Sequence, residues 1–80
     1  MYYTYIIQSK TTHRYYCGQT NNLDDRLSRH NSNRSKATNA KGPWNLIKQY
    51  RFNTRSEAVL MERRIKSRGI ERFLNDDMPG

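Results

Sequence analysis

The stretch Tyr2–Gly18, YYTYIIQSKTTHRYYCG, decides the fold of this 80-residue chain. Its first part, Tyr2 to Ser9, is mostly aromatic and β-branched, which is typical of a half-buried strand. A turn without large apolar residues follows over Lys10 to Arg14, and a second short strand is predicted over Arg14 to Gly18. The stretch therefore predicts a β-hairpin.

Tyrosine is concentrated in this hairpin, which holds five of the six tyrosines of the chain. One explanation is a sheet core, because tyrosine favours strands. The alternative is a functional cluster, because a buried tyrosine hydroxyl needs a partner and aliphatic residues would fill a core without that need. Tyr5 and Tyr16 are the two candidates for a functional role once the rest of the chain is considered.

Length and composition set limits on the class of protein. Residues 1–80 are expected to form a single domain with a thin core, since a chain of this size buries only about 60–65% of its unfolded surface. The sequence has no apolar run of membrane-spanning length and no signal-peptide pattern. Its single cysteine, Cys17, cannot form an internal disulfide, so a reducing, cytoplasmic location is expected.

The charge of the chain is strongly positive, with a formal net charge of +8 and a sequence pI near 10.1. Most of the basic residues are arginines, which bind phosphate in a planar, bidentate way. No acidic residue occurs from Arg26 through Ser56. These features favour a nucleic-acid partner over a membrane surface, because no basic amphipathic helix is present; a merely soluble cationic domain is the remaining alternative.

A helix is predicted over about Leu23 to Asn31, with Leu23 and Leu27 at its inner edge. Arg26 and His30 are four residues apart and therefore project from one face of this helix. That face is either solvated surface or part of a site, and the helix alone does not decide between the two.

The polar, basic segment Asn31–Pro43 is predicted to be a loop with at most one helical turn, near Lys36 to Asn39. Loops of this length are uncommon unless they are functional or disordered. In the functional interpretation it contacts a phosphate backbone through basic residues there and just before it: Arg29, Arg34, Lys36 and Lys41.

A third strand is predicted over Trp44 to Phe52, and a short helix over Ile70 to Asn75 near the end of the chain. Between them, Thr54 and Glu57 match a capping box that begins a helix. This helix is expected to run to about Ser67.

One carboxylate interrupts the apolar stripe of that later helix, which consists of Ala58, Met61, Glu62 and Ile65. A carboxylate beside apolar residues costs free energy unless it is paired or bound to a metal. Lys66, four residues after Glu62, could be the ionic partner, so spacing alone leaves an ion pair and a metal site open.

Together these residues resemble the GIY-YIG nuclease motif. Tyr3-Thr4-Tyr5 stands in the place of the first triplet and Tyr16-Cys17-Gly18 in the place of the second, with ten residues between Tyr5 and Tyr16. Arg26, His30 and Glu62 follow in the family's order. The chain looks like the short, stand-alone, excinuclease-like bacterial subgroup. It departs from the motif at Tyr3, Thr4 and Cys17, which shape the strands.

The resemblance implies an α/β (α+β) domain in which a three-stranded antiparallel sheet is flanked by helices and the site residues converge on one face. It also implies an endonuclease that hydrolyses a phosphodiester bond in DNA with Mg²⁺ or Mn²⁺, in a structure-specific repair or recombination role. RNA stays open as a substrate, no membrane is involved, and an 80-residue domain is expected to need a protein partner for specificity.

The implied roles are specific to each residue. Glu62 binds the metal, Arg26 stabilises negative charge on the phosphate, and Tyr16 orients water or phosphate. Tyr5 is the general base, although a free phenol has a pKa near 10 and needs help; His30 is the alternative base. Gly18 lets the backbone turn beside the site, and Asn75 loosely matches a further structural position.

A second hypothesis belongs to a different class of function. The same fold could serve as a non-catalytic module that binds DNA or RNA, and the basic segment alone would support this. Cleavage of nucleic acid by the purified chain separates the two hypotheses.

Overall fold

A computed structural model describes residues 1–32 and 42–77 of the chain. The predicted basic loop between Asn31 and Pro43, including its helical turn, lies largely outside the described residues. Six elements follow one another along the chain: β1 (Tyr2–Ser9), β2 (Tyr15–Thr20), α1 (Leu23–Asn31), β3 (Trp44–Phe52), α2 (Arg55–Arg68) and α3 (Ile70–Asp77).

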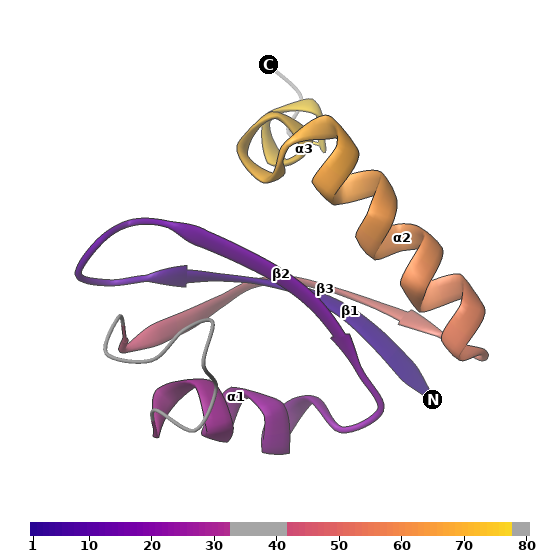
Figure 1. Cartoon of the computed structure of the whole chain (residues 1–80), viewed down its shortest axis with the longest axis horizontal. Coiled ribbons are helices and arrows are strands. Elements are labelled where there is room, and N and C mark those ends of the chain that lie inside the picture. The colour runs from indigo at the N-terminus through magenta and orange to yellow at the C-terminus, as the bar shows by residue number, and fades with distance from the viewer. Residues whose placement is uncertain (33–41, 78–80) are drawn as a thin grey trace.

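The strands form one antiparallel sheet in the order β2-β1-β3, so that the first strand is central and β2 is an edge. Figure 1 shows α1 on one face of the sheet and α2 with α3 on the other. In this view the β2 edge passes in front of the other strands. The predicted fold class, a three-stranded antiparallel sheet flanked by helices, is confirmed.

Two details of the predicted hairpin are wrong. The second strand begins one residue later than expected and continues to Thr20, because Tyr3 and Thr4 of β1 pair with Thr20 and Gln19. Gly18 therefore lies inside β2, opposite Tyr5, and not at a turn.

Helix ends follow the capping chemistry that the sequence indicates. The Thr54 hydroxyl accepts from the Glu57 backbone N–H, which confirms Thr54 as the helix cap; the Glu57 carboxylate reaches back to the Thr54 hydroxyl instead of the backbone N–H of a full capping box. Asn22 caps α1 by accepting from the Asp25 N–H. Gly69 ends α2 with a φ of 95°, a conformation that side-chain-bearing residues rarely adopt.

Each face of the sheet has its own core. On the α1 side, Tyr5, Ile7 and Trp44 are buried. On the α2 side, the buried members are Ile6, Cys17 and Ile65, against which residues of α3 also pack. The Thr4 hydroxyl donates to the Ala58 carbonyl at 2.7 Å and fixes α2 against β1. None of the helices in the described ranges has the length and apolar composition needed to cross a bilayer.

Candidate active site

The Tyr5 ring extends over Gly18 of the edge strand β2. These two residues pair across β1 and β2, and Tyr5 is fully buried. A Cβ added at Gly18 would lie 2.6 Å from the Tyr5 Oη and 2.9 Å from its Cζ. The Tyr5 ring therefore occupies the space that any other residue at position 18 would fill. Gly18 acts at the site by leaving room for this ring, and not by turning the backbone.

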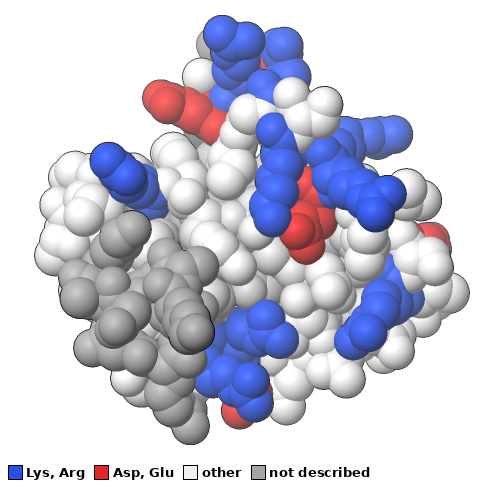
Figure 2. Space-filling model, in the orientation of Figure 1, with Lys and Arg blue, Asp and Glu red and all other residues white. Residues whose placement is uncertain are grey.

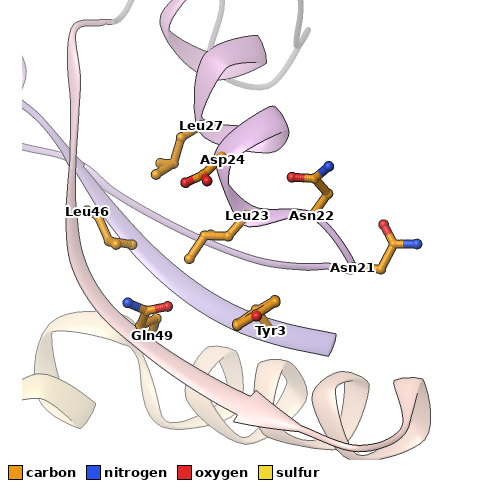
Figure 3. Close-up of a pocket in the computed structure, with 8 residues that line it drawn as sticks. All are labelled: Tyr3, Asn21, Asn22, Leu23, Asp24, Leu27, Leu46 and Gln49. Carbon is orange, nitrogen blue, oxygen red and sulfur yellow. The ribbon is translucent and has the colours of Figure 1, made fainter. Parts of the chain in front are cut away.

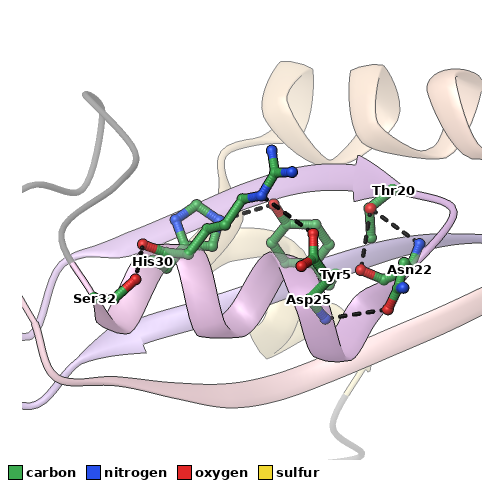
Figure 4. A network of polar contacts seen from close by, with 7 residues as sticks. Tyr5, Thr20, Asn22, Asp25, His30 and Ser32 are labelled. Carbon is green, nitrogen blue, oxygen red and sulfur yellow. Dashed lines mark hydrogen bonds and ion pairs between the residues drawn. The ribbon is translucent and has the colours of Figure 1, made fainter.

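The Tyr5 hydroxyl is directed at the last turn of α1, where it lies 2.9 Å from Nε2 of His30 (Figure 4). His30 is only 1% exposed. Its ring also packs against Tyr16 and Trp44, with centroid separations of 5.1 and 6.5 Å. The structure thus brings Tyr5, Tyr16 and His30 together beneath α1, as the sequence predicts.

The electrostatic environment favours neutral forms of both bonded groups. Burial raises the pKa of Tyr5 well above its usual value, and the charge and hydrogen bond of Arg26 only partly oppose this. Burial, aided by the Arg26 charge, lowers the pKa of His30. A neutral imidazole can accept the Tyr5 proton at Nε2, whereas a free Tyr5 phenolate is disfavoured. Of the two kinds of help expected for Tyr5, nearby cations or a partner such as His30, the structure places His30 in hydrogen-bonding contact.

Glu62 corrects the prediction that all site residues share one face. It lies on α2, which covers the face opposite to α1, and it is half-buried. Its charge nevertheless adds to the increase in the pKa of Tyr5, and after burial it is the second cause of the rise of the Cys17 pKa to about 11. The Glu62 charge therefore acts on Tyr5 and on Cys17, although Glu62 belongs to a helix on the other face of the sheet.

Lys66 binds the same carboxylate. Its Nζ lies 2.7 Å from Oε2 of Glu62, which is the ion pair that the i, i+4 spacing allows. The side chain of Glu62 is 23% exposed, so it is accessible from solvent. The structure shows the ion pair, so a metal at Glu62 would share this carboxylate with Lys66.

The donor chemistry at Glu62 fits a hard divalent cation. Mg²⁺ is usually held by one or two carboxylates, with water and substrate oxygens completing its shell. Within the described residues, no group of three or more His, Cys, Asp and Glu side chains could hold a metal. Glu62 would therefore be the protein's carboxylate ligand, and most of the shell would come from water and substrate.

The remaining predicted residues have mixed outcomes. Arg29 pairs with Asp25 at 3.1 Å on the exposed side of α1. Asn75 is exposed on α3, and no polar contact within the described ranges joins it to the tyrosines. Three predicted nucleic-acid contacts lie outside the described residues: Arg34, Lys36 and Lys41.

Positive charge is present on both sides of the β2 edge. Figure 2, in the orientation of Figure 1, shows Lys and Arg side chains over the helices above this edge and over the helix below it, around a largely uncharged centre. A polyanion that crosses the edge would meet cations from both layers.

Sequence reasoning missed the contact that holds the end of α1 to β3. The Asn31 side chain accepts from the Trp44 N–H at 2.6 Å, and its amide donates to the Trp44 carbonyl at 3.4 Å. This places the Trp44 ring beside His30. No spacing rule links residues thirteen apart across a loop, so the sequence carried no signal for it.

Comparisons with known proteins agree with one another. Residues 1–70 match the family model described as the GIY-YIG catalytic domain. The chain is 36% identical over 66 residues to UPF0213 protein OB0043 of Oceanobacillus iheyensis, covering 81% of this chain and 76% of that protein. The solution NMR structure of UPF0213 protein BH0048 from Bacillus halodurans matches with a TM-score of 0.57 and 28% identity, covering 94% of this chain and 81% of that one.

Proposed function

The chain belongs to the GIY-YIG family, a family of nucleases, and from this membership we propose that it is a divalent-metal-dependent endonuclease that hydrolyses a phosphodiester bond in DNA. The observation that carries the proposal is the pairing of Tyr5 with His30 beside Gly18, with Arg26 and Glu62 close enough to act on the same phenol. Such a cluster of perturbed groups is typical of a catalytic site.

Tyr5 and His30 act as one proton-transfer unit in this proposal. As Tyr5 accepts a proton from the attacking water, its own proton passes to Nε2 of His30, 2.9 Å away. In this arrangement His30 stands behind Tyr5, because its Nε2 atom faces the Tyr5 hydroxyl. The raised pKa of Tyr5 is then no obstacle, since no free phenolate has to accumulate.

Arg26 and Glu62 would stabilise the phosphate group during cleavage. The Arg26 guanidinium is half-exposed on α1 and can stabilise the negative charge that develops on the phosphoryl oxygens. Glu62 would hold Mg²⁺ or Mn²⁺, which when bound supplies Lewis-acid stabilisation of the phosphate and the leaving oxygen. Tyr16 borders Tyr5 and His30 and would orient the water or the phosphate.

Cell-biological parts of the proposal rest on composition. A buried, unpaired Cys17 fits a reducing cytoplasm. The proposal further includes recognition of DNA structure, in repair or recombination, with a protein partner that adds specificity.

Cleavage of branched, nicked and plain duplex DNA in Mg²⁺ or Mn²⁺ tests the proposal. Glu62→Ala should abolish new ends while leaving DNA binding nearly intact, because a single carboxylate would anchor the metal. Glu71→Ala, which removes an exposed glutamate from α3, is the matched control and should cleave normally. Cleavage that continues in excess EDTA would rule out the metal role.

A second function is favoured by one observation. Lys66 already neutralises Glu62 at 2.7 Å, as it would in a domain that binds nucleic acid without cutting it. A steep salt dependence of DNA or RNA binding, with no cleavage on any substrate, would identify such a module.

A further inference from the structure

A pocket of about 310 Å³ lies beside the candidate active site, between α1 and β3. Figure 3 shows side chains of α1 facing those of β3 across it, with Tyr3 of β1 between them. Its lining consists of Tyr3, Asn21, Asn22, Leu23, Asp24, Leu27, Leu46 and Gln49. The proposed catalytic residues do not line it, so it is a separate feature.

The lining chemistry argues against a phosphate. Among the residues that the structure describes, none that lines the pocket is a lysine or arginine, and Asp24 contributes a negative charge. This differs from the rest of a chain with a net charge of +8. What the pocket offers is an aromatic ring, leucine side chains and three amides. These are the groups that stack on a base and bind its edge.

We propose that this pocket takes an unpaired nucleobase of the DNA substrate. The inference rests on the proposed function, since it assumes that the substrate is DNA. A base stacked on Tyr3 would contact the leucine side chains of α1 and β3. The amides of Asn21 and Gln49, both on exposed residues, would bind its hydrogen-bonding edge. Asn22 contributes less, because its Oδ1 already caps α1.

The position of the pocket connects it to the phosphate site. Tyr3 lies two residues before Tyr5 on β1, and residues two apart in a strand face the same side of a sheet. Leu23 and Leu27 belong to α1, the helix that carries Arg26. A nucleotide whose phosphate lies at Arg26 therefore has a neighbouring base within reach of Tyr3.

A cation suited to the backbone of that nucleotide lies just outside the pocket. Arg51 pairs directly with Tyr3 across β1 and β3 and is exposed. Its cross-strand position places it on the same face as Tyr3. Arg51 of β3 and Arg26 of α1 thus belong to the two elements on either side of the pocket, and both could contact phosphates next to a bound base.

Fluorescence of 2-aminopurine tests this proposal. The base analogue is placed at an unpaired position in one DNA duplex and at a paired position in another, and the protein is titrated in EDTA so that no cleavage occurs. We expect binding to the unpaired site to be roughly tenfold tighter and to quench its fluorescence, because stacking on an aromatic ring is worth about a factor of ten or more per base.

Tyr3→Ala should remove both the preference and the quenching, and Tyr3→Phe should keep them. Tyr2→Ala is the matched control, since Tyr2 is the neighbouring tyrosine of β1 and does not line the pocket. Gln49→Ala, at an exposed position of β3, gives a second variant that should weaken the preference without a large change in fold.

Equal affinity for the paired and unpaired duplexes would overturn the proposal, as would an equal loss in the Tyr2 and Tyr3 variants. Because binding is measured without metal, these results do not depend on catalysis. A parallel reaction in Mg²⁺ reports separately on the nuclease activity, so the failure of one proposal is not mistaken for the failure of the other.

Discussion

On one face of the sheet, Tyr5 and Tyr16 contact the His30 ring of α1, whereas on the other face Ile6 packs against Ile65 of α2. Both sides are buried, but the first contains hydroxyl and imidazole groups that bond to each other, and the second is almost entirely apolar. The α2 side is therefore expected to supply stability and the α1 side chemistry. Glu62 is the exception that links them at the β2 edge.

Ile65→Ala should give the largest effect on stability. Ile65 is fully buried on the apolar side, and deleting such a side chain typically lowers the free energy of unfolding by about 2–5 kcal/mol. Urea denaturation measures the loss, and Ile47→Ala, at a residue 41% exposed on β3, is the control with little expected change. Similar losses in both variants would mean that the apolar side does not dominate stability.

Gly18→Ala should lower both the stability of the protein and its cleavage activity. The new Cβ would push the Tyr5 ring away from His30, so we expect a loss of about 1–3 kcal/mol in unfolding free energy together with loss of cleavage. Gly69→Ala also strains the chain, because Gly69 has a φ of 95°, but it should leave cleavage per folded molecule unchanged. Normal cleavage by Gly18→Ala would show that the Tyr5 position is not essential.

The pH dependence of the unfolding free energy tests the α1 side of the sheet separately, through His30. Burial and the Arg26 charge lower the pKa of His30, whereas in the unfolded chain it titrates near about 6.5. As the pH falls below that value, the unfolded state binds the proton first, so the free energy of unfolding should decrease. Above about pH 6.5, His30 should add no pH dependence to the free energy of unfolding.

Thermal unfolding between about pH 7 and 5 measures this, a window in which most carboxylates stay ionised. His30→Asn should remove the dependence, and His13→Asn, at an exposed histidine in the hairpin turn, should keep it. If His30→Asn kept the dependence and His13→Asn removed it, His30 would not be the group that titrates.

Lys66→Met should have the smallest effect on stability. Exposed i, i+4 ion pairs contribute only about 0.3–0.5 kcal/mol, but this lysine competes for the carboxylate that we assign to the metal. We expect tighter Mn²⁺ binding by calorimetry. Arg29→Met breaks the comparable Asp25–Arg29 pair on α1 and should leave Mn²⁺ affinity unchanged. Weaker Mn²⁺ binding in the Lys66 variant would remove Glu62 as the metal ligand.

The sequence predicts the local features of the molecule better than the way its two sides meet. Strand composition, the Thr54 cap and the spacing of Arg26 and His30 are local signals, and the ordered tyrosines identified the family. The placement of Glu62 on the opposite face depends on how α2 packs against the sheet, which no local pattern encodes. The role of Gly18 likewise depends on the strand register that puts it opposite Tyr5.

Paramagnetic broadening by Mn²⁺ tests most directly whether residues from the two faces of the sheet form one site. In ¹⁵N–¹H spectra at low Mn²⁺ occupancy, we predict that the Gly18 N–H and the Arg26 Nε–H broaden together with the amides around Glu62. Signals from β3 should stay sharp, and Glu62→Gln should abolish the effect. Broadening confined to α2, with Gly18 and Arg26 unaffected, would contradict a shared site at the β2 edge.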